Sequence, residues 1–155
     1  MSVHGGLLRL ETRGDGQIID ITDGVTRVIA TSGVTRGLVT VFVVGSTAAV
    51  TTMEYEPGGV TDLQALLERL IPARGDYAHN RLNHDSNSHA HQRASLIGPS
   101  ESIPSHAHQR ASLIGPSESI PLVDGRLTLG TWQQIVLIDF DDRPRDRTVS
   151  VQVVS

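Results

Sequence analysis

The chain has 155 residues, of which 38% are hydrophobic and 3% aromatic, and it carries a net charge of −4. This length and apolar content suit one domain with a largely aliphatic core. Cysteine is absent, which excludes disulfides and thiolate metal sites. No apolar run reaches the length of a membrane span, and the acidic balance does not favour nucleic-acid binding. We therefore expect a cytoplasmic protein without membrane or nucleic-acid partners.

The N-terminal region predicts two strands and a short helix. Residues 7–11 and 17–21 alternate apolar and polar side chains around a Gly-Asp-Gly turn, which is typical of a β-hairpin. A helix capped by Thr22 or Asp23 should follow and end at Gly33, because glycine readily adopts the left-handed backbone of a helix end.

The next region predicts two more strands and a second helix. Residues 37–44 are rich in β-branched side chains and should form a central strand, and residues 48–54 should form another. Leucines spaced at i, i+3, i+4 and i+7 make residues 61–70 the clearest helix, which Pro72 ends. Residues 72–87 lack periodicity and are expected to be an ordered loop.

The C-terminal region predicts strands only. Residues 120–123 and 126–129 flank an Asp-Gly pair, a strong hairpin signal. Residues 133–140 and 148–154 complete the strands, joined by a charged turn. The whole pattern predicts a compact single α+β domain over residues 1–155, with an antiparallel sheet or sandwich and two helices.

Between these regions the chain contains the same 17 letters twice. Residues 88–104 and 105–121 both read SHAHQRASLIGPSESIP. Only one copy can occupy a given place in the fold, so we expect the other copy to be extruded as a loop. The entropy cost of closing a loop grows slowly with its length, so a long insertion need not unfold the domain. We favour the arrangement in which the first copy supplies the histidines, because it leaves the loop from His79 to His91 continuous. In the alternative, His106 and His108 take their place.

Six of the seven histidines lie between His79 and His108. If His89 and His91 begin a strand, their side chains share a face, with Cα atoms roughly 6.5–7 Å apart. His79 or His84 would then supply a third ligand, leaving one position open, as in catalytic zinc sites. The expected cofactor is a divalent metal ion, with zinc favoured over magnesium. The alternative is that the His-x-His pair is an ordinary surface feature, since such pairs are common.

Carboxylates and hydroxyls give weaker signals. Asp85 could bind the metal, orient a histidine or act as a base. Glu54 and Glu56 with Asp62 could bind a hydrated cation, or be solvated or capping groups around a Gly-Gly turn before a helix. Four hydroxyls in Gly-containing turns could hold phosphate, or belong to ordinary turns. These are Ser46, Thr47, Ser100 and Ser117.

Together these motifs resemble the YjbQ-like family, also called secondary thiamine-phosphate synthases. The matching elements are GSTAAVTTMEYEP from Gly45, the segment from Tyr77 to His91, RASLIGPS, the turn at Val123-Asp124-Gly125, and GTWQQI from Gly130. The resemblance implies homotrimers with metal clusters near subunit interfaces. It gives most weight to His79, Asp85 and His89, then to Glu54 and Asp62. The chain departs from the family pattern at Gly45, where relatives often have His, and in the duplication itself.

Two functions remain open at this stage. The first is a metal-dependent enzyme that joins a pyrimidine diphosphate to a thiazole phosphate, and so takes phosphorylated small-molecule substrates. The second is a non-catalytic trimeric metal-binding protein, or a chain engineered to carry a duplicated segment. An all-histidine site suits zinc, whereas the departure of diphosphate usually involves magnesium bound by oxygen ligands.

Overall fold

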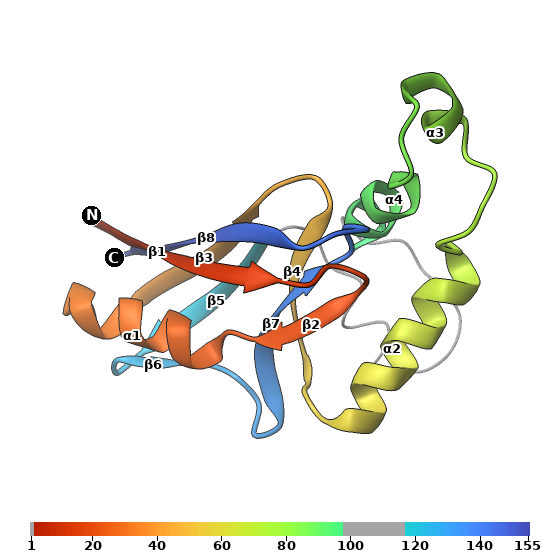
Figure 1. The fold of residues 1–155 in the computed structure, drawn as a ribbon. Coiled ribbons are helices and arrows are strands. Elements are labelled where there is room, and N and C mark those ends of the chain that lie inside the picture. The colour runs from red at the N-terminus through yellow and green to blue at the C-terminus, as the bar shows by residue number, and fades with distance from the viewer. Residues whose placement is uncertain (1, 98–116) are drawn as a thin grey trace.

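The computed structural model describes residues 2–97 and 117–155, and these form two antiparallel sheets and four helices (Figure 1). The larger sheet has the strand order β1 (Val3–Thr12), β8 (Arg145–Val154), β3 (Gly37–Val44), β5 (Ser117–Val123), β6 (Arg126–Leu127). The smaller sheet has the order β2 (Gln17–Asp20), β7 (Gln133–Asp139), β4 (Ala48–Glu54). The α+β class, the antiparallel pairing and the single domain are confirmed.

The core has two layers that share strand β7. Ile135 and Leu137 belong to the cluster between the two sheets, which α1 (Thr22–Ser32) completes. Val136 and Ile138 belong to the cluster beneath α2 (Pro57–Leu70) and α4 (Ser88–Leu96). Because β7 is buried on both faces, its sequence is a continuous apolar run rather than an alternating one.

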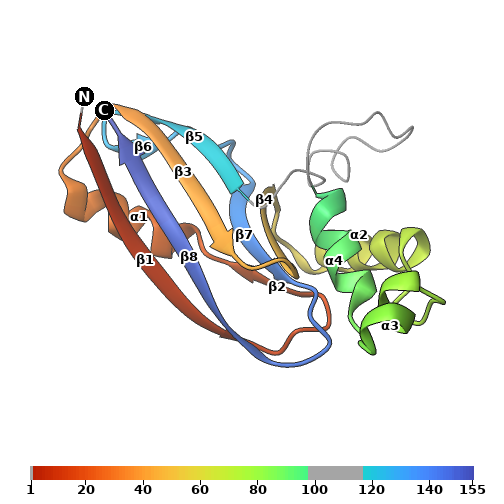
Figure 2. The same cartoon turned by 90° about the horizontal axis from the view of Figure 1, so that it is seen from above.

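Three helices gather at one end of the molecule: α2, α3 (Ala78–Asn83) and α4 (Figure 2). Helix α2 begins after Glu56, whose carboxylate accepts hydrogen bonds from the backbone N–H groups of Gly58 and Gly59. The longest helix in the described parts of the chain has 14 residues, whereas a membrane span needs about 20. Within those parts, none has the length and apolarity to cross a bilayer.

Several predicted elements are confirmed. Helix α1 ends at Gly33, whose φ is 68°, β3 lies at the centre of the larger sheet, and β4 spans the predicted residues. The hairpin of β5 and β6 turns through Asp124 (φ 50°) and Gly125 (φ 74°). Positive φ at both central residues is the geometry that an Asp-Gly pair favours.

The predicted hairpin at the N-terminus is wrong. Strand β1 pairs with β8 and β2 pairs with β7, so the two strands lie in different sheets. The turn between them is hydrogen-bonded to the end of β7. The backbone N–H of Asp15 donates to the Asp141 carbonyl, and the backbone N–H of Gly16 donates to the Asp139 carbonyl. The Gly-Asp-Gly segment therefore moves the chain from one sheet to the other.

Residues 2–97 and 117–155 contain four helices, whereas the sequence pattern predicts two. Residues 72–87, expected to be a loop, contain α3, and the expected strand at His89 is helix α4. The first copy of the repeated segment supplies α4, and the second supplies β5 from Ser117 onward. The predicted extruded loop falls largely on residues 98–116, outside the described residues.

Candidate functional site

A pocket of about 570 Å³ opens beside α3 and α4 and is lined by two of the predicted histidines, His79 and His91. The centroids of their imidazole rings are 5.1 Å apart. His79 comes from α3 and His91 from α4. The packing of two short helices therefore brings these rings together, rather than a shared strand face.

Both rings are held by hydrogen bonds. Nδ1 of His91 donates to the backbone carbonyl of Ser46 over 3.1 Å, which leaves Nε2 as the nitrogen that can accept a ligand. The side-chain amide of Asn83 lies 3.2 Å from Nδ1 of His79, one helical turn away. Ser46 thus contacts His91 through its backbone carbonyl.

His89 does not share the face of His91. Residues two apart on a helix point in different directions, so the helix separates a pair that a strand would have aligned. His89 is 6% exposed, and its Nδ1 has no hydrogen-bond partner among the described residues. Burial, and then the nearby charge of Arg93, lowers the pKa of His89 and favours a neutral imidazole.

The opposite face of α4 is fixed to α2 by Arg93. Its guanidinium donates to the Ile71 carbonyl at 2.9 and 2.7 Å and to the Glu68 carboxylate at 2.5 Å. The hydrogen bond from Arg93 lowers the pKa of Glu68. These contacts hold α4 so that His91 faces the pocket.

The segment that connects α3 to α4 carries the other predicted groups. His84 ends α3 with a φ of 54° and is exposed. Asp85 accepts a hydrogen bond from the backbone N–H of Ser86 at 2.7 Å. Neither side chain lines the pocket of His79 and His91.

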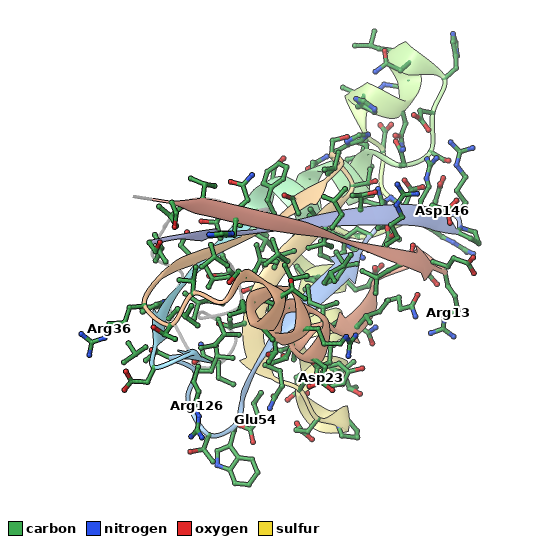
Figure 3. All side chains as sticks on the ribbon, turned by 90° about the vertical axis from the view of Figure 1, so that its left-hand side faces the viewer. Arg13, Asp23, Arg36, Glu54, Arg126 and Asp146 are labelled. Atoms are coloured by element: carbon green, nitrogen blue, oxygen red, sulfur yellow. The ribbon has the colours of Figure 1, made fainter. Side chains whose placement is uncertain are left out.

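The remaining carboxylates are far from these histidines. Glu54 is the last residue of β4, and Ser46, which contacts His91, lies just before this strand begins. A seven-residue strand of about 20 Å therefore separates Glu54 from Ser46. Figure 3 shows Glu54 at the end of the molecule away from α3. Asp62 is exposed on α2. In residues 2–97 and 117–155, no three His, Asp or Glu side chains gather closely enough to hold a metal ion.

The predicted phosphate-binding hydroxyls have different surroundings. Thr47 is buried, donating from Oγ1 to Asp141 and accepting from Arg147, both at 2.8 Å. Its hydroxyl is therefore engaged inside the protein. Ser100, like His106 and His108, lies outside the described residues, and only the backbone of Ser117 is described.

A buried ionic network joins β7 and β8 through Arg147 and two aspartates. Arg147 donates to both carboxylate oxygens of Asp139, at 2.7 and 2.6 Å, and all but a few per cent of both side chains is buried. Burial acts to raise the pKa of Asp141, but hydrogen bonds from Arg145 and Thr47 outweigh it and the pKa is lowered. The sequence signal was the alternation of arginines at 143, 145 and 147 after an acidic strand end.

Comparison with known proteins agrees with this architecture. A sequence model described as "UPF0047 protein YjbQ-like" matches residues 7–105 and 104–155. The chain is 33% identical over 153 residues to a UPF0047 protein of Methanothermobacter thermautotrophicus, covering 99% of this chain and 93% of the relative. It is 36% identical over 147 residues to one from Archaeoglobus fulgidus, covering 95% and 98%.

Solved structures show the same likeness. A YjbQ/UPF0047 family protein of Clostridium acetobutylicum matches with a TM-score of 0.75 and 36% identity, over 96% of this chain and 98% of its own. A hypothetical protein of Aeropyrum pernix matches with a TM-score of 0.79 and 32% identity, over 97% and 98%. The chain belongs to the YjbQ-like UPF0047 family.

Proposed function

We propose that this protein binds a divalent metal at His79 and His91 and joins a pyrimidine diphosphate to a thiazole phosphate. The observation that carries the proposal is the pair of imidazoles 5.1 Å apart at a pocket of about 570 Å³. That volume is in the range of pockets that hold small organic ligands. The resemblance to secondary thiamine-phosphate synthases supplies the reaction.

The two imidazoles can act as metal ligands, with Nδ1 of His79 exchanging its contact with the Asn83 amide for the metal, but they are not a complete set. Catalytic zinc commonly has three protein ligands, so a third ligand would come from a substrate phosphate or a neighbouring subunit. The hydrogen bond from His91 to the Ser46 carbonyl is the kind that orients a metal-binding imidazole. A bound divalent cation would stabilise the negative charge of the departing diphosphate.

The reaction needs positioning more than proton transfer. The thiazole nitrogen forms a bond to the methylene carbon of the pyrimidine as the bond from that carbon to the diphosphate oxygen breaks. The oxygen keeps the electron pair, and the ring nitrogen becomes a thiazolium cation. The chain contributes by holding two phosphorylated substrates in line and excluding water.

Homotrimer formation is a second part of this proposal. Apolar side chains on the outer face of the larger sheet remain exposed, whereas Val39, Val41 and Val43 on the inner face of β3 are buried. The exposed residues are Val3, Leu7, Leu38, Phe42, Val44 and Val123. An apolar patch of this kind favours assembly with other copies, and the resemblance suggests three.

The experiment combines zinc titration with an assay of diphosphate release from the two precursors. We expect His79→Ala and His91→Ala each to weaken zinc binding at least tenfold and to abolish turnover. His4→Ala is the matched control, because His4 is an exposed histidine on β1, and it should change neither.

Each outcome has a clear meaning. Zinc binding that depends on both histidines, without turnover of the precursors, would favour the non-catalytic metal-binding protein. Zinc binding that survives both substitutions would overturn the proposed metal site.

A further inference from the structure

An exposed tryptophan stands on a turn between β6 and β7. Residues 130–133 form a β-turn, in which the backbone N–H of Gln133 donates to the Gly130 carbonyl at 3.0 Å. Trp132 is the third residue of this turn, and 70% of it is exposed. The large apolar surface of an indole is usually buried or used for contact. Its exposure in this chain therefore points to a binding role.

The turn that carries Trp132 is held firmly. The Gln133 side chain accepts a hydrogen bond from the Gly130 backbone N–H at 3.0 Å and donates to the Thr52 hydroxyl at 2.8 Å. Thr52 is 8% exposed on β4, so the turn is tied to the sheet. The backbone beside the indole is thus already ordered, which lowers the entropy cost of binding a ligand there.

A pocket of about 310 Å³ adjoins the indole and is lined in part by Met53, Glu54 and Trp132. Among the described residues that line it, Glu54 alone carries a charge. An indole face attracts cations through its quadrupole, and a carboxylate adds a full negative charge. The thioether of Met53 adds a polarisable apolar wall.

We propose that this pocket binds a small organic cation, either a quaternary ammonium or an N-alkylated aromatic ring, between Trp132 and Glu54. The volume lies at the lower end of the range for ligand pockets, which suits one ring or one compact cation. A metal ion fits less well, because hard cations take six or more oxygen ligands and the pocket offers one carboxylate. The site lies at the far end of β4 from Ser46 and does not depend on the proposed function.

The single tryptophan makes the site directly measurable, because the protein has one indole N–H signal in an NMR spectrum. Added N-methylpyridinium should change the chemical shift of this signal up to a plateau, as expected for a saturable site. It should bind at least tenfold more tightly than toluene, its uncharged isostere. Glu54→Gln should weaken the cation about tenfold. Glu11→Gln, which neutralises an exposed carboxylate on β1, should leave the affinity unchanged.

A second measurement follows the ligand itself. Saturation transfer from the protein to N-methylpyridinium should disappear in Trp132→Leu. Equal binding of the cation and toluene, or unchanged binding by Glu54→Gln, would overturn the proposal. An indole signal that moves with protein concentration alone would also overturn it, since a second copy of the chain would then cover Trp132.

Discussion

Gly14 shows how a single residue allows the chain to change sheets. Its φ is 74°, and an added Cβ would lie 2.6 Å from the Arg143 carbonyl oxygen and closer still to that of Asp141. Gly16, two residues on, has a φ of 72° but open space around it. The two glycines thus share a backbone conformation and differ in how closely their neighbours approach.

This difference gives a matched prediction. Gly16→Ala should cost about 1 kcal/mol in the free energy of unfolding, from the left-handed backbone alone. Gly14→Ala should cost about 2 kcal/mol more, because rigid backbone atoms occupy the space of the new methyl group. Urea denaturation of both variants measures the difference, and equal losses would show that the contact with 141 and 143 is unimportant.

At the scale of the element, the helical conformation of α4 determines where the side chains of His89 and His91 lie. The sequence reveals alternating strands and the Asp-Gly hairpin because these signals are local. It does not reveal α4, because SHAHQRASL lacks a clear apolar stripe, and the helix depends on tertiary contacts of Ala90 and Ala94 with the core and of Arg93 with α2. His79 and His91 are brought together by the packing of α3 against α4, and the spacing of residues in the sequence does not predict this packing.

The first copy of the repeated segment forms α4, and the end of the second begins β5. We propose that most of the second copy is an insertion relative to the family pattern. Asn87 supports this arrangement, because it directly precedes the helix and is only 7% exposed. With the second copy in this place, Pro104 would precede the helix and the buried Asn87 side chain would be missing from this position. The break of the family match near residue 104 is consistent with an insertion.

Equivalent arginines in the two copies test this proposal. Arg93→Ala should lower the free energy of unfolding by about 2 kcal/mol, because a buried guanidinium loses its charge-assisted hydrogen bonds. Arg110→Ala changes the same letter in the second copy and should leave stability within about 0.5 kcal/mol. Thermal unfolding of both variants gives the comparison. A larger loss from Arg110→Ala would mean that the second copy forms the helix.

At the scale of the whole molecule, the exposed face of the larger sheet predicts the assembly. Phe42→Glu replaces a half-exposed apolar side chain of this face by a charge and should convert the proposed trimers into single chains, as measured by light scattering. Leu82→Glu is the control, since Leu82 is 79% exposed on α3 and lies away from this face. A Phe42→Glu protein that remains trimeric would show that the subunits meet elsewhere.

His91 takes part both in the proposed metal site and in the proposed arrangement of the repeated segment. If α4 is formed by the first copy, His91 carries the ligand nitrogen, and His108 is its unused counterpart in the second copy. A site held by two imidazoles should lose most of its affinity when one is removed.

The most direct test is therefore isothermal titration of zinc into His91→Ala and His108→Ala. The proposed site predicts at least a tenfold loss of zinc affinity in His91→Ala and no loss in His108→Ala. A loss confined to His108→Ala, or zinc binding untouched by either change, would contradict the account.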